Sequence, residues 1–366
     1  MDRRVTLLLA LLLTATAFAG CMGGGDGGNG TTTTTTPAGG GTTTTTTTTN
    51  PTSPTVTPPT LPTLPVSGPS DVYGMTTGSS TGVYFAIGNG IAAAVRNQTG
   101  AGFTIPEVAT SQGSVQNVQR LKADDHQLAL MQNDVLYQAY NGNGSFSGAA
   151  VKELRAVAAL YPEMIQVVTL KSANINSLAD LADKKVVLGA PGSGAAVNAG
   201  QILNASGVAA QTQYLALSDA AEQLKDGRVD AIFWTGGIPT GALVSLATTH
   251  PLRIVPIDAP TKAKLQAESP FYANVTLPAN TYAGQDQAVD TVAVVAVLVA
   301  RADVAADDVA SLLRVIFDGT AVQSSHAQGQ HIKLDNAFQG VVGVPWHEGA
   351  TYYYLSKGKT PPGSGS

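Results

Sequence analysis

Two glycine-rich loops carry the residues of this sequence that are best suited to hold a ligand through the backbone. The first, GSSTG, spans Gly78–Gly82, and the second, GAPGSG, spans Gly189–Gly194. Each loop stands directly before a predicted helix, so the unpaired N–H groups of that helix N-terminus face it. These groups carry a partial positive charge that favours a carboxylate or a phosphate even without arginine or lysine. Glycine lets a ligand approach the backbone, and the hydroxyls add hydrogen-bonding groups.

Neither loop matches a known catalytic motif. GAPGSG is not GxGxxG, and no GxxxxGK[ST] sequence occurs in the chain. Ser193 stands in PGSGA rather than in GxSxG, so a hydrolase nucleophile elbow is not indicated. No Asp or Glu pair has a spacing that points to acid–base catalysis. We therefore expect no enzyme, no metal and no cofactor.

The histidines show no metal-ligand spacing either. They fall mostly next to predicted turns or at the ends of elements. We expect all of them on the surface: His126, His250, His326, His331 and His347.

The two loops belong to a unit that occurs twice. Helical runs over Val83–Asn97 and Ala195–Asn204 follow the first and second loop, and the offset between the loops is 112 residues (82 to 194). A second pair of matching segments, at 127–132 and 230–235, follows two Leu-Lys pairs that are 103 residues apart (122 to 225). The similar offsets predict two α/β lobes. Ligands of open α/β sheets bind beyond the carboxyl ends of the strands, so we expect the site in a cleft between the lobes.

Apolar runs rich in β-branched residues mark the expected strands. They are Ile165–Leu170, Lys185–Leu188, Ala231–Trp234, Leu252–Ile257 and Thr291–Ala300. The fold class is therefore α/β. We expect lobe 1 over 71–163 and 290–357, lobe 2 over 164–289, and a flexible tail over 358–366.

Residues 1–20 are expected to be a lipoprotein signal peptide. A basic start precedes an apolar run, Val5–Ala19, which is shorter than the roughly 20 residues that span a bilayer. Cys21 follows Ala-Gly directly, as in the lipobox of prokaryotic lipoproteins, although Phe18 replaces the usual leucine. We expect Cys21 to be lipidated; the alternative is a secreted protein with a free cysteine. Residues 21–70, rich in Gly, Thr and Pro, are expected to be a disordered tether.

Composition excludes several classes of protein. The net charge of −5 and the 12% of charged residues disfavour a nucleic-acid binder. A single cysteine excludes an internal disulfide and any multi-cysteine metal site.

Six stretches between about Val72 and Leu355 carry a family resemblance. They are Ser79–Gly90 (SSTGVYFAIGNG), Leu128–Asp134 (LALMQND), Leu154–Glu163 (LRAVAALYPE), Val187–Asn198 (VLGAPGSGAAVN), Asp226–Gly237 (DGRVDAIFWTGG) and Tyr282–Ala293 (YAGQDQAVDTVA). Together they resemble the TAXI family of TRAP-transporter-associated extracytoplasmic solute receptors. Ser111–Ser114 reads SQGS where relatives often have GGS.

The resemblance implies a two-lobed periplasmic-binding-protein-like fold (class II-like) with hinge strands that close on a small solute. It implies a TRAP transporter solute receptor that delivers a carboxylate such as glutamate, glutamine or 2-oxoglutarate to TRAP membrane permease subunits. The lipid anchor would be its only membrane attachment, at the outer face of the cell membrane. The alternative is a ligand-sensing module of the same fold that acts on a separate signalling partner.

The ligand-binding candidates come from the loops and from the positions that match the family. They are Ser79, Ser80, Thr81, Gly82, Tyr84, Gln132, Pro191, Gly192, Ser193, Gly194, Trp234, Thr235 and Gly236. Trp234 would either line the cleft or pack in the core, and Gln132 would either cap a helix or bind the ligand. Tyr272 and Tyr282 are further cleft candidates, and Arg155 is the nearest candidate for a charged anchor.

Overall fold

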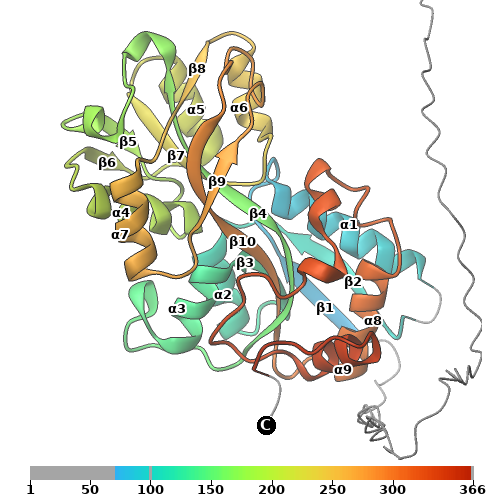
Figure 1. Cartoon of the computed structure of the whole chain (residues 1–366). Helices are drawn as coiled ribbons and strands as arrows, with labels where there is room; N and C mark the ends of the chain where they lie inside the picture. Colours follow the sequence, from blue (N-terminus) through green and yellow to red (C-terminus); the bar gives the residue numbers. More distant parts are fainter. Residues whose placement is uncertain (1–70, 99–100, 364–366) are drawn as a thin grey trace, which may run out of the picture. The chain divides into compact units, whose positions relative to one another are not determined.

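The computed structural model describes residues 71–98 and 101–363 (Figure 1). The expected signal peptide, the lipidation residue Cys21 and the tether lie outside the described residues. Within those two ranges, no helix is long and apolar enough to cross a membrane.

A mixed sheet organises the described chain, in the order β2-β1-β3-β10-β4-β7-β5-β6. β1 pairs in parallel with β2 and β3, and β5 pairs in parallel with β6 and β7. Between these groups run β4 and β10, which are antiparallel to each other; β8 pairs with β4 and β9 with β10. The bounds are β1 Asp71–Thr76, β2 Phe103–Ala109, β3 Leu128–Gln132, β4 Leu154–Leu170, β5 Lys185–Val187, β6 Gln211–Gln213, β7 Ala231–Gly236, β8 Leu252–Val255, β9 Ala273–Leu277 and β10 Val289–Arg301.

Two groups of helices cover the sheet, one at each end of the crossing strands (Figure 1). With β1–β3, the first half comprises α1 Val83–Asn97, α2 Ser114–Lys122, α3 Asn133–Asn141, α8 Ala306–Phe317 and α9 Glu348–Ser356. With β5–β9, the second half comprises α4 Gly194–Ser206, α5 Leu217–Lys225, α6 Gly241–Ala247 and α7 Ala259–Glu268. The α/β class expected from the sequence is confirmed.

β4 and β10 are shared by both halves. The ladder between them runs from Leu154 opposite Arg301 to Met164 opposite Ala293. Beyond that point β4 pairs with β7 and β8, whereas β10 pairs with β9. The register shifts twice along this ladder, and such bulges increase the local twist of a strand pair. Because each strand runs from the first half into the second, β4 and β10 are the covalent connection between the halves (Figure 1).

The second half buries both faces of its strands. Val167 and Phe233 lie in one apolar cluster, while their neighbours Val168 and Ile232 lie in another. Successive strand residues point to opposite faces, so a strand buried on both faces is apolar at every position. This explains why the expected strands stood out as continuous apolar runs. The first half has its own cluster, which includes the β10 residues Ala296–Ala300.

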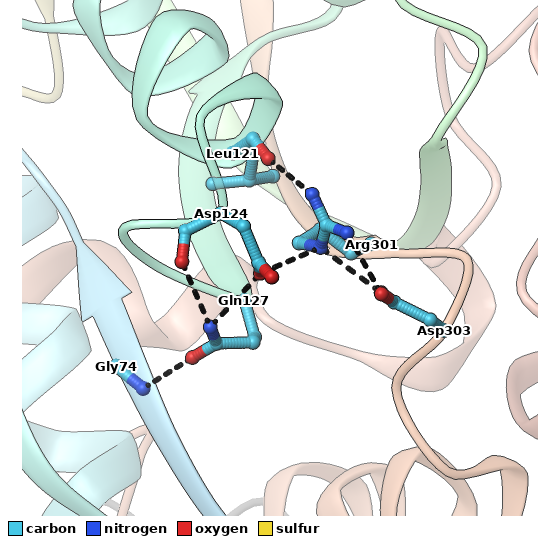
Figure 2. Close-up of polar contacts among 6 residues, drawn as sticks. All are labelled: Gly74, Leu121, Asp124, Gln127, Arg301 and Asp303. Carbon is cyan, nitrogen blue, oxygen red and sulfur yellow. Dashed lines mark hydrogen bonds and ion pairs between the residues drawn. The ribbon is translucent and has the colours of Figure 1, made fainter.

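Arg301 ties the end of β10 to the turn between α2 and β3 (Figure 2). Its guanidinium donates to the Leu121 carbonyl at 2.6 Å and to the Asp303 carboxylate at 3.0 and 2.7 Å. Its Nε also lies 3.0 Å from Asp124 Oδ1, which accepts a 3.2 Å hydrogen bond from Gln127. The Arg301 side chain is only 12% exposed, whereas its partners Asp124 and Asp303 are 59% and 63% exposed, so the guanidinium is shielded and the carboxylates remain in contact with water.

The expectation that all histidines lie on the surface is wrong for two of them. His126 packs beneath β1 and His347 is 2% exposed. His347 stands at the N-cap of α9, where its Nδ1 accepts the Gly349 N–H at 3.2 Å. Burial penalises the charged imidazole and lowers the pKa of His347 to about 4. His347 stands at the end of a helix, yet it lies in the interior, because α9 packs against α8 and β4.

Candidate functional site

A pocket of about 650 Å³, including the part open to solvent, forms where the two glycine-rich loops meet. The first half contributes Gly78, Ser79, Gly82–Tyr84, Ser111–Ser114, Gln132, Tyr161 and Glu163. The second half contributes Ala190, Ser193–Ala195, Ala216, Leu217 and Trp234–Gly237.

Five helix N-termini converge on this pocket. The N-cap residues of α1, α2, α3, α4 and α5 all line it: Gly82, Gly113, Gln132, Ser193 and Ala216. Ser193 caps its own helix by accepting the Ala196 N–H at 3.1 Å, whereas the other four make no side-chain capping bond. Uncapped N-termini leave N–H groups for a ligand, and their dipoles favour negative charge. Part of this capacity is already used, because Asp134 and Asp219 stand in the first turns of α3 and α5 and the Gln116 N–H of α2 is bonded.

Three buried side chains of the pocket have polar atoms without a partner in the described part of the chain. They are Gln132 Oε1, Tyr161 Oη and Thr235 Oγ1. These residues are 3%, 2% and 6% exposed, so bulk water does not satisfy them. A buried polar group left unpaired costs about 1–3 kcal/mol. A polar ligand that bonds to these atoms would recover that free energy.

Glu163, on β4, is the carboxylic acid of the pocket lining. It is 3% exposed, and its Oε2 accepts a 2.6 Å hydrogen bond from the Tyr84 hydroxyl. Burial, with a smaller contribution from the charge of Asp134, raises the pKa of Glu163 to about 8. Burial and the neighbouring Glu163 also raise the pKa of Tyr84 well above 10. The lining contains no Lys, Arg or His.

The two walls of the pocket touch each other. The Gln116 N–H, in the first turn of α2, donates to the Gly192 carbonyl of the opposite half at 3.1 Å. A Cβ atom on Gly194 would stand 2.0 Å from Gln132 Oε1. A larger residue at Gly194 would therefore displace the end of the Gln132 side chain from its present place in the pocket.

Most of the ligand-binding candidates meet in this pocket. Those that line it are Ser79, Gly82, Tyr84, Gln132, Ser193, Gly194, Trp234, Thr235 and Gly236. Four others do not: Ser80, Thr81, Pro191 and Gly192. The first three are exposed at the tips of the two loops, and the Gly192 carbonyl is bonded to α2.

The remaining candidates lie near the pocket or away from it. Trp234 combines the two roles that were given as alternatives. It lines the pocket, and it also packs half-buried against an apolar cluster. Its indole N–H donates to the Thr240 hydroxyl at 3.0 Å. Tyr282 bonds to Gln166 and Thr240 and does not line the pocket. Tyr272 bonds to Asn198 and lies outside the lining too. Arg155 donates to two nearby backbone carbonyls and is no part of it.

Sequence reasoning missed several lining residues, above all Ser111–Ser114, Tyr161 and Glu163. Two signals were present. Ser111–Ser114 stands directly before a helix, as the two glycine-rich loops do. Tyr161 and Glu163 are two residues apart on β4, so their side chains face the same side of the strand. Within the described ranges, no three or more His, Cys, Asp or Glu side chains group to hold a metal.

Comparison with known proteins places the chain in a family. The model of the NMT1-like family matches residues 75–358, which is most of the chain, and the protein therefore belongs to the NMT1-like family. The match spans both halves and the whole pocket.

Solved structures of solute-binding proteins resemble it more distantly. The periplasmic aliphatic sulphonate binding protein SsuA from Escherichia coli is 15% identical, with a TM-score of 0.44. The match covers 80% of this chain and 84% of SsuA. An ancestral arginine-binding protein bound to arginine is 14% identical, with a TM-score of 0.45 and coverage of 71% and 99%. The ligand binding component of an ABC-type import system from Staphylococcus aureus is 12% identical, with a TM-score of 0.44 and coverage of 72% and 79%.

Proposed function

We propose that this protein is an extracytoplasmic solute-binding receptor that captures a small carboxylate and delivers it to membrane transport subunits. The observation that carries the proposal is the convergence of five helix N-termini on one pocket between two halves of the fold. Four of them lack a cap from the N-cap side chain, and their N–H groups favour an anion where they are not already bonded, as the Gln116 N–H of α2 is. The three unpartnered side-chain atoms supply the remaining polar contacts.

The arrangement supports binding rather than catalysis. Ser193 Oγ already accepts from Ala196 and donates to the Ala190 carbonyl at 2.8 Å, and no histidine lines the pocket to activate it. A nucleophile needs a base within hydrogen-bonding reach. The pocket lies between halves joined by two strands, an arrangement suited to hinge closure around a ligand.

Sequence features favour one transporter type and one location. The TAXI-like stretches favour delivery to TRAP permease subunits. The lipobox-like residues before Cys21 favour a lipid anchor at the outer face of the cell membrane. Replacing Cys21 by Ser tests the anchor directly, because the variant should leave the membrane fraction and appear in the medium or the periplasm.

A thermal-shift screen of the purified chain tests the ligand class. The compounds are glutamate, glutamine, 2-oxoglutarate and succinate, with glucose and putrescine as controls. A ligand at 100 times its Kd stabilises the folded state by about 2.7 kcal/mol. For a body of this size that raises Tm by roughly 5–10 °C. A shift with the controls and none with the carboxylates would contradict the proposal.

Thr235→Val adds a sharper test. The Thr235 hydroxyl is buried without a partner, so the valine should raise the Tm of the ligand-free protein and lower affinity for the ligand. Thr169→Val is the matched control, since its hydroxyl donates to the Asp230 carbonyl at 2.7 Å outside the pocket. That variant should lose stability and keep its affinity. Unchanged affinity in Thr235→Val would remove Thr235 from the site.

A further inference from the structure

The ionisable side chains of the pocket are unbalanced in charge. Glu163, Tyr84 and Tyr161 line it, all acids, and no basic side chain accompanies them. Asp134, at the first turn of α3, is the other charged group that acts on Glu163, and it is an acid as well. A buried carboxylate normally has a cationic partner or several hydrogen-bond donors. Glu163 has a single donor, Tyr84, among the described residues.

We propose that Glu163 binds a protonated amine of the ligand, so that the solute is a zwitterion of the amino-acid type. The inference rests on the proposed function, because it assigns the second charge of the same ligand. The ammonium group would supply the countercharge that the protein lacks around Glu163. The carboxylate would lie against the uncapped helix N-termini.

The unpartnered atoms of the pocket fit an ammonium group. Such a group has three N–H donors and no acceptor. Besides Glu163, Gln132 Oε1 can only accept, and the Tyr161 and Thr235 hydroxyls each have free acceptor capacity. A ligand with only carboxylates would instead bring a second negative charge toward Glu163. Such a ligand would have to bind with Glu163 in its protonated form, which can donate one hydrogen bond but supplies no charge.

The high pKa of Glu163 agrees with a missing partner. Desolvation is its largest cause, and no cation among residues 71–98 and 101–363 opposes it. An ammonium beside Glu163 would favour the ionised form, so binding should release a proton near pH 7. Affinity for an amine should then rise as the pH goes from about 7 to about 8, a range in which Glu163 titrates and the other acids that face it do not. Tyr84 and Tyr161 stay neutral there, and Asp134 titrates at about 6.

Matched pairs that differ only at the amine test the proposal. They are L-glutamate and glutarate, L-leucine and 4-methylpentanoate, and L-phenylalanine and 3-phenylpropanoate, measured by calorimetry on the full chain. We expect the amine-bearing member of the best-bound pair to bind at least tenfold more tightly. Equal or tighter binding of the amine-free member overturns the role of Glu163 and leaves the carboxylate receptor intact. Binding of no member contradicts the receptor for small carboxylates itself.

Glu163→Gln tests the residue. The variant keeps the shape and removes the charge, so affinity for the amine-bearing member should fall about 10- to 100-fold while its partner is unaffected. Asp134→Asn is the matched control: Asp134 is equally buried, accepts from Asn198 at 2.9 Å and does not line the pocket. It should keep the preference for the amine. A preference that survives in Glu163→Gln refutes the proposal. If that variant does not fold, the wild-type pairs still decide.

Discussion

Gly194→Ala separates the effect of loop contact from that of folding. Gly194 opens α4 and faces Gln132 from the opposite half. The added Cβ would lie 2.0 Å from Gln132 Oε1 and 2.4 Å from its Cδ, against about 3.4 Å for an ordinary contact. Either the Gln132 side chain or the whole loop must move by about 1.4 Å. Movement of the Gln132 side chain or separation of the halves relieves the collision. Either change should weaken ligand binding, because Gln132 lines the pocket, and leaves each core intact.

The expected size of the effect follows from the cost of overpacking. Inserting a methyl group where there is no room costs about 1–3 kcal/mol. Because about 1.4 kcal/mol corresponds to a factor of ten, the Kd should rise about 5- to 150-fold. The Tm of the ligand-free protein should stay the same or rise, since alanine favours the helix over glycine.

Gly200→Ala is the control within the same helix. A Cβ there meets nothing within 4 Å, so the variant should gain up to about 1 kcal/mol of stability and keep its Kd. Calorimetric titration with the best compound of the screen gives Kd, and thermal melting gives Tm. The reasoning is refuted if Gly194→Ala keeps its affinity. It is also refuted if Gly194→Ala in a Gln132→Ala background costs as much as it does alone.

Three further changes test other parts of the structure. Trp234 lines the pocket, so in a Trp346→Phe background its fluorescence should change on ligand addition; a silent signal would favour a purely structural role. Neutral His347 is favoured by the fold, so the free energy of unfolding should fall as pH drops from 6.5 to about 4. His347→Asn should flatten that decline in urea titrations, and an unchanged slope would contradict the assignment. Arg301→Ala should lose about 2–3 kcal/mol, whereas exposed Arg228→Ala should change stability by less than 1 kcal/mol; equal losses would refute this ranking.

The elements with a strong local pattern were predictable from the sequence. α1 covers the expected Val83–Asn97, because a glycine-rich turn precedes a long apolar and alanine-rich run. β10 covers Val289–Arg301 around the expected Thr291–Ala300. Of β4, only the end, Ile165–Leu170, was expected with bounds, although a crossing strand was expected around Arg155. Its first part contains Pro162, which cannot donate to a sheet ladder and normally argues against a central strand.

The part of the site that is made of loops directly before helices was predictable from the sequence. Glu163 was missed because its importance comes from tertiary pairing. β4 must lie between β10 and β7 before its carboxyl can reach a pocket made by loops far away in the chain. Ser80 and Thr81 were included because they share a loop with Ser79. Only the turn geometry decides which of the three faces inward. The lobe boundaries and the ligand contacts remain predictions.

The shared ladder of β4 and β10 has an evolutionary consequence. Met164 and Ala293 are paired at its end, so the chain leaves for the second half and returns from it at one point. The second half is therefore an insert whose two ends lie side by side. Another sequence with adjacent ends could replace it without a change in the path of the chain through the first half. A chimera spliced there would keep Glu163 and acquire a new opposite wall. If Glu163 binds an amine as proposed, such exchange would change the part of the ligand that the second half contacts while retaining recognition of that amine.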